Sequence, residues 1–207
     1  MPDLQGIKKE IARMAASSLK MLQTTFAAFM EHDRDLVAAA LEEEKRINDL
    51  EKEITTQLVE FARNTPSKRE HAEALILAEV AGDLELIGDY CKDILERIEI
   101  KIEERLLFNE ETVKEYTELY RRTEDAFEEV CRAIEKDDPS AVGTVLKKEE
   151  HIDGLVDVFR RRHNERMIAG ACTPMSCNML MNILDYTAAV YYHVKKIARN
   201  LLKMPNA

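Results

Sequence analysis

The chain has 207 residues, of which 45% are hydrophobic and 34% charged, with a formal net charge of −10 at pH 7. With only 6 Gly, 5 Pro and no Trp, the composition favours long α-helices over a turn-rich antiparallel β protein. The acidic balance argues against nucleic-acid binding, which depends on Lys and Arg neutralising phosphates. No apolar run reaches the roughly 18 residues of a membrane span, so we expect a cytoplasmic, all-α protein.

Capping residues predict where the helices begin. Four expected starts carry an N-cap residue, in three cases directly before a proline: Thr65-Pro66, Asn109, Asp138-Pro139 and Thr173-Pro174. A polar break at residues 31–33 separates the first two helices. We therefore predict six helices, at 3–31, 34–63, 66–106, 110–136, 139–169 and 174–203. Rods of about 45 Å must pack side by side.

The second half of the chain repeats the first. Residues 44–50 (EKRINDL) correspond to residues 149–155 (EEHIDGL). The polar break at residues 31–33 likewise corresponds to residues 135–137. A repeat of about a hundred residues is too long for a solenoid unit. The prediction is a tandem of two antiparallel three-helix bundles, residues 1–107 and 108–207, linked near Phe108.

The segment 83–89 (DLELIGD) carries two carboxylates four positions apart, Glu85 and Asp89, and Asp93 follows one turn later. On a helix these side chains share one face and form a half-site for a hard cation. The alternative is a solvated acidic face, because such pairs are common in a chain with 40 acidic residues. Gly88 costs a helix about 1 kcal/mol relative to Ala, which indicates a close neighbour there.

Catalytic signatures are absent from the sequence. It contains no P-loop, nucleophile elbow, Rossmann glycine pattern or H-E-x-x-H, and it lacks the E-x-x-H spacing of di-iron bundles. The four cysteines form no CxxC pair, so we expect reduced thiols. Cys172 and Cys177 flank a turn, but the sequence places no His near them to complete a zinc site.

Together these features resemble the PhoU family, tandem three-helix-bundle proteins that regulate phosphate uptake. The resemblance extends from about Glu10 to Leu202. It rests on the segment 83–89 with Ile94 and Glu96, on Ile47-Asn48 and Ile152-Asp153, and on residues 163–166 (HNER) before Cys172-Thr173-Pro174.

The resemblance implies metal ions bound through E/D-x-x-x-D motifs on helix surfaces. The ion would be divalent or ferric, such as iron, zinc, magnesium or nickel. The residues carried over are Glu44, Asn48, Glu85, Asp89 and the adjacent Asp93 in the first bundle, and Glu149 and Asp153 in the second. The last helix has Ala188 and Tyr192 in place of the acidic pair, with only Asp185 and His193 nearby. We therefore expect the first bundle to bind metal more strongly.

The resemblance also implies a non-catalytic regulator of phosphate transport and phosphate-responsive signalling. The expected partner is a phosphate transporter, through its ATPase or permease, or a sensor kinase, and the expected oligomer is a homodimer that reaches the membrane only through this partner. Residues 10–15 with Met21-Leu22 also resemble PhoU-like domains attached to sodium/phosphate cotransporters, so a free-standing protein and a soluble piece both stay open. The alternatives are a metal-dependent helical-bundle enzyme and a structural helical adaptor.

Overall fold

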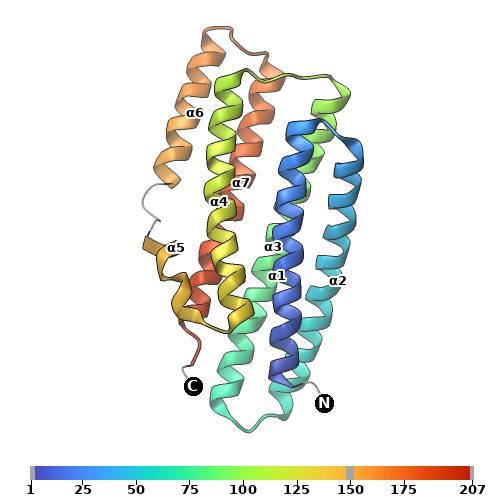
Figure 1. The fold of residues 1–207 in the computed structure, drawn as a ribbon, viewed down its shortest axis with the longest axis vertical. Coiled ribbons are helices and arrows are strands. Elements are labelled where there is room, and N and C mark those ends of the chain that lie inside the picture. Colours follow the sequence, from blue (N-terminus) through green and yellow to red (C-terminus); the bar gives the residue numbers. More distant parts are fainter. Residues whose placement is uncertain (1–2, 148–151, 206–207) are drawn as a thin grey trace.

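The computed structural model describes residues 3–147 and 152–205. Every regular secondary-structure element in these ranges is a helix, and none is a β-strand. The elements in chain order are α1 (Leu4–Glu31), α2 (Arg34–Asn64), α3 (Lys68–Glu103), α4 (Glu110–Lys136), the 3-10 turn η1 (Pro139–Val142), α5 (Gly143–Lys147), α6 (Ile152–Ile168) and α7 (Pro174–Leu202). Figure 1 shows the long helices lying side by side as extended rods. The all-α prediction is confirmed.

Most predicted helix starts agree with the structure. The side chain of Asn109 accepts a hydrogen bond from the backbone N–H of Thr112 at 2.8 Å, and Thr173 caps α7 in the same way. The third helix differs, because Ser67 rather than Thr65 caps it. Thr65 instead ends α2, where its N–H donates to the carbonyl of Phe61 at 3.0 Å. Pro66 disfavours helical backbone geometry at the preceding residue, Thr65. The helix therefore ends there and the chain reverses direction.

The prediction of one helix over 139–169 is wrong. The described residues form the 3-10 turn η1, the short helix α5 and, after a gap at 148–151, the helix α6. Ser140, Gly143 and Thr144 are poor helix formers compared with Ala or Leu, so the start of this segment lacks the propensity of the other helices. The chain consequently packs η1 and α5 against α4 and α7 before α6 begins.

Helices α1, α2 and α3 pack on one another, and α7 packs on α4 and α6. Contacts of α3 with α7 and of α1 with α4 join these two sets, as Figure 1 shows, with α2 and α6 on opposite sides. The buried side chains of both sets form one apolar cluster. The arrangement matches two three-helix bundles, while the domain boundary near Phe108 stays a prediction. Within the described residues, no helix combines the length and apolarity needed to cross a membrane.

Candidate functional site

The acidic side chains of the segment 83–89 face different neighbouring helices in the structure. Asp83 is 1% exposed and faces α7, where its Oδ1 accepts hydrogen bonds from His193 Nδ1 at 2.9 Å and Lys196 Nζ at 2.8 Å. Glu85 and Asp89 are partly exposed and lie near acidic side chains of α2. The sequence pattern identified Glu85 and Asp89. It gave no role to Asp83, because the partners of Asp83 are more than a hundred residues away in the sequence.

Gly88 marks the close approach of α2 to α3. A Cβ atom at this position would lie 3.4 Å from Cγ2 of Ile47, which is van der Waals contact. Both residues are buried. The close neighbour predicted from this mid-helix glycine is therefore α2, and the contact brings the acidic faces of the two helices together.

Glu44 and Asn48 of α2 supply oxygen atoms on this side of the bundle. Glu44 is 5% exposed, and its Oε1 accepts hydrogen bonds from Asn48 Nδ2 at 2.9 Å and Lys92 Nζ at 3.2 Å. Among the described residues, Asn48 Oδ1 finds no hydrogen-bond partner although it is buried. A buried carbonyl oxygen without a donor is costly, and coordination to a hard cation would satisfy it. The chemistry of these donors therefore suits such an ion, although among the described residues no three carboxylates of this face have ligand oxygens within 4.8 Å of one another.

The carboxylates of this face repel one another. Burial raises the pKa of Glu85, and the neighbouring Asp89 raises it further. Burial also raises the pKa of Asp89, followed by the charge of Glu44, while Lys92 lowers it and Asp93 adds a smaller increase. The structure thus brings Glu44, Glu85, Asp89 and Asp93 within electrostatic reach. A divalent cation would offset the repulsion among them.

The second predicted site receives less support. Glu149 lies outside the described residues, as does the side chain of Asp153, whose backbone belongs to α6. On α7, Asp185 accepts a hydrogen bond from Arg160 Nε at 3.1 Å, and His193 is engaged with Asp83 of the first bundle. The α7 side chains nearest the expected positions thus serve packing between helices.

The prediction of four reduced thiols is wrong. Cys172 and Cys177 form a disulfide, whereas Cys91 and Cys131 are free. His163 of α6 lies beside the pair, and one ligand atom from each of the three residues falls within 4.8 Å of the other two. No other group of three His, Cys, Asp or Glu residues in the described ranges is as close together. The sequence concealed this cluster because its residues come from α6, from the loop after it and from α7.

The fold is an all-α bundle of long helices, with carboxylates and an amide on the facing helices α2 and α3. Residues 11–98, which cover most of α1, all of α2 and most of α3, match the family profile described as the PhoU domain. This match covers less than half of the chain, and over that segment it confirms the resemblance to the PhoU family.

One relative by sequence and two solved structures are similar to this chain. The chain is 36% identical over 90 residues to the phosphate-specific transport system accessory protein PhoU homolog 1 of Thermotoga maritima, an alignment covering 44% of this chain and 38% of that relative's length. The crystal structure of PhoU from Pseudomonas aeruginosa superposes with a TM-score of 0.90 at 18% identity, covering 97% of this chain and 96% of that one. The phosphate transport system regulatory protein PhoU from Streptococcus pneumoniae has a TM-score of 0.85 at 12% identity, covering 99% and 98%. These likenesses establish the two-bundle fold.

Proposed function

We propose that this protein is a non-catalytic regulator of phosphate transport and phosphate-responsive signalling. The observation that carries the proposal is the PhoU domain at residues 11–98. It is supported by the name of the Thermotoga maritima relative, an accessory protein of a phosphate-specific transport system. In this proposal the protein acts in the cytoplasm as a homodimer that docks on a phosphate transporter, through its ATPase or permease, or on a sensor kinase.

The metal in this proposal is a divalent or ferric ion held between α2 and α3. Its ligands would be Glu44 and Asn48 from α2 with Glu85 and Asp89 from α3, while Asp93 adds negative charge. The unsatisfied Asn48 Oδ1 and the mutual repulsion of the carboxylates support such an ion. Oxygen donors of this kind suit hard cations.

The ion would fix the relative position of the two helices. Lys92, whose side chain is 45% exposed, now forms an ion pair with Glu44 at 3.2 Å, and a bound cation would compete with it for this carboxylate. Binding therefore favours the arrangement in which α2 and α3 present one defined outer surface. The resulting population shift can be no larger than the difference in metal affinity between this arrangement of α2 and α3 and the alternative one.

Metal analysis of the purified protein tests the site. We expect bound metal in the wild-type protein and its loss in the Glu85→Gln/Asp89→Asn variant, which removes two charged ligands. The matched control is Glu99→Gln/Glu103→Gln, a second pair of exposed acids four positions apart on α3. Metal loss in both variants, or in neither, would place the ion elsewhere.

Phosphate physiology tests the regulatory role separately. Deleting the gene should disturb phosphate accumulation or phosphate-responsive expression, and the wild-type gene should restore both. The Glu85→Gln/Asp89→Asn gene should restore them less well if the metal favours docking. Normal uptake and expression in the deletion strain, in phosphate-poor and phosphate-rich media, would favour the structural adaptor instead.

A further inference from the structure

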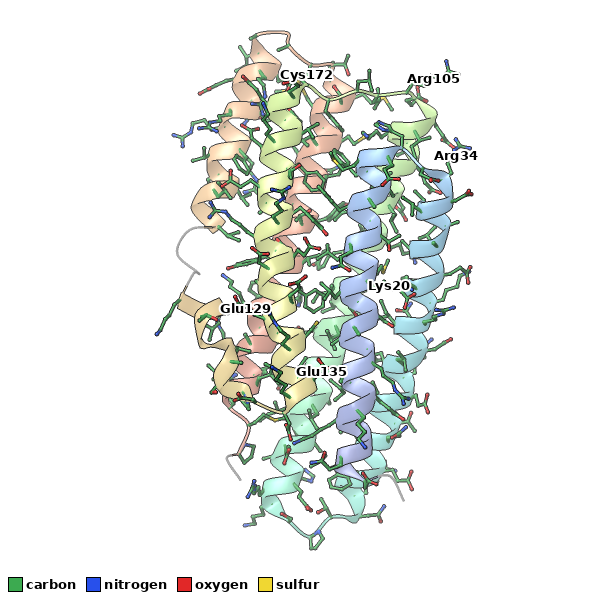
Figure 2. The ribbon with its side chains drawn as sticks, in the orientation of Figure 1. Lys20, Arg34, Arg105, Glu129, Glu135 and Cys172 are labelled. Carbon is green, nitrogen blue, oxygen red and sulfur yellow. A yellow bond between two sulfur atoms is a disulfide. The ribbon has the colours of Figure 1, made fainter. Side chains whose placement is uncertain are left out.

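The cluster of His163, Cys172 and Cys177 lies apart from the acidic face of α2 and α3. Its residues come from α6, from the loop that follows it and from α7. Figure 2 shows Cys172 at the end of the molecule that also carries Arg34 and Arg105. A disulfide that only fastens a short loop has no need of an adjacent imidazole. The position of His163 therefore requires a separate explanation.

His163 has the environment of a metal-binding histidine. It is 2% exposed, and its Nε2 lies 2.9 Å from the backbone carbonyl oxygen of Cys177. A carbonyl oxygen can only accept, so Nε2 carries the proton and Nδ1 has a free lone pair. Nδ1 is buried and has no hydrogen-bond partner among the described residues. Histidines that bind metals usually donate one ring N–H to a carbonyl or carboxylate while the other nitrogen coordinates the ion.

We propose that His163, Cys172 and Cys177 form a zinc site that becomes available when the disulfide is reduced. The proposal rests on the geometry of the three ligand atoms, which lie within 4.8 Å of one another. Two thiolates and one imidazole are a characteristic zinc-ligand set, and three protein ligands leave a fourth position for water. The soft sulfur donors favour zinc over magnesium or calcium.

The oxidised and metal-bound states exclude each other, because disulfide sulfurs cannot act as thiolate ligands. A dithiol reductant transfers two electrons and two protons to the disulfide, which breaks the S–S bond, yields two thiols and leaves the reductant as its own disulfide. Binding of Zn²⁺ then releases two protons from the thiols. The ion joins the C-terminal part of α6 to the start of α7.

The surroundings suit the thiolate ligands of such an ion. Cys177 lies in the first turns of α7, whose capped N-terminus stabilises negative charge such as that of a thiolate. A cavity of about 260 Å³ is lined by His163 and Cys172 and also by Arg105 and Arg166. This space gives water access to the fourth coordination position. Cys172 is itself partly exposed, so a reductant can reach the disulfide.

Cobalt spectroscopy of the full chain tests the proposal. The protein, reduced with a water-soluble phosphine under anaerobic conditions, is titrated with Co²⁺. We expect one equivalent to produce thiolate-to-cobalt charge-transfer absorption and the intense visible bands of tetrahedral Co²⁺, and Zn²⁺ should abolish both. The oxidised protein should show neither signal. An ion on the carboxylates of α2 and α3 would give no thiolate absorption, so this result does not depend on the proposed function.

Single substitutions identify the ligands. Cys172→Ser, Cys177→Ser and His163→Gln should each weaken Zn²⁺ binding by more than about 100-fold, because even outer-shell partners of metal ligands contribute 10–100-fold. Cys131→Ser, at a free cysteine on α4, is the matched control and should bind as wild type does. Circular dichroism checks that each variant folds, and the partly exposed Cys172 provides a test if the buried His163 variant does not.

Three results would overturn the metal site, and a fourth would overturn its dependence on reduction. The first is a reduced wild-type protein without thiolate absorption. The second is full absorption in folded Cys172→Ser protein, and the third is unchanged Zn²⁺ affinity in folded His163→Gln protein. Equal thiolate absorption from the oxidised protein would refute the dependence on reduction.

Discussion

Asp83 of α3 and His193 of α7 are joined by a hydrogen bond of 2.9 Å between Oδ1 and Nδ1, in the interface that links the two halves of the molecule. Lys196 Nζ donates to the same oxygen at 2.8 Å. The buried carboxylate of Asp83 is therefore the centre of a polar contact between α3 and α7. It joins residues of α3 and α7 that are 110 and 113 positions apart in the sequence.

Replacing Asp83 by Ala should destabilise the protein substantially. The change leaves two donors of α7 without their acceptor, and removal of one partner from a buried polar pair costs about 2–4 kcal/mol. Asp185→Asn is the control on α7, since its pair with Arg160 is exposed and should contribute less than about 1 kcal/mol. Urea denaturation measures both. Equal losses of unfolding free energy would mean that the Asp83 contact has no special weight.

Substitutions at Gly88 probe the contact with Ile47. We expect Gly88→Ala to stabilise the protein by about 0.5–1 kcal/mol, because alanine favours the helix and its Cβ would be in contact, 3.4 Å from Ile47, without overlap. Gly88→Leu should cost about 1–3 kcal/mol by overpacking. A Cβ at Gly82, on the same helix, would have no neighbour within 4 Å, so Gly82→Leu should be tolerated. Thermal unfolding of the wild-type protein and the three variants distinguishes these outcomes.

Without bound metal, repulsion among the carboxylates between α2 and α3 should lower the stability of the protein. A carboxyl group whose pKa is raised in the folded state binds more protons there than in the unfolded chain, so its contribution to stability falls as pH rises through the folded pKa. In a chelator at pH 7, Glu85→Gln/Asp89→Asn should therefore be more stable than wild type. The gain should be on the order of 0.5–1 kcal/mol, because solvent screens these partly exposed groups.

This advantage should disappear at acidic pH, where the wild-type carboxyls are protonated as well. Added metal should stabilise wild type and leave the variant unchanged. Chemical denaturation from acidic to neutral pH, with and without metal, measures both effects. A variant that is less stable than wild type in chelator at pH 7 would contradict the expected repulsion.

Because Lys101 is buried, we expect a second pH dependence of the free energy of unfolding, at alkaline pH. Lys101 is 2% exposed, and its ammonium group donates to the carbonyl of Phe29 at 2.7 Å and lies 2.5 Å from Nε2 of His32. Burial lowers the pKa of Lys101 from 10.5 to about 8. Between these values the unfolded chain binds more protons, so stability should rise with pH by up to about 1.4 kcal/mol per unit.

The Lys101→Met variant lacks this titration. The wild-type protein should therefore gain stability relative to Lys101→Met as pH increases from about 8 to 10.5. Lys114→Met, at an exposed position of α4, should follow the wild-type curve. Urea midpoints across this range provide the measurement. Parallel curves for wild type and Lys101→Met would show that Lys101 is not desolvated.

Local sequence determined the helices and much of their order. The caps at Asn109 and Thr173 predicted two helix starts because a cap depends only on its own side chain and the next turn. The acidic pair Glu85 and Asp89 was also readable, since residues four apart share a helix face. The repeat indicated the two bundles, which the likeness to solved structures confirmed. Metal binding by these residues stays a prediction.

Tertiary packing decided what each face meets. Helix α3 contacts α1, α2 and α7, so Asp83 could have faced any of them, and only the packed structure pairs it with His193. The same holds for His163, which α6 and α7 bring to Cys172 and Cys177 although the sequence separates them. Local rules act over a few residues, whereas partners on different helices are chosen by the burial of all helices together. The acidic pair followed from the sequence, and the histidine–cysteine cluster only from the fold.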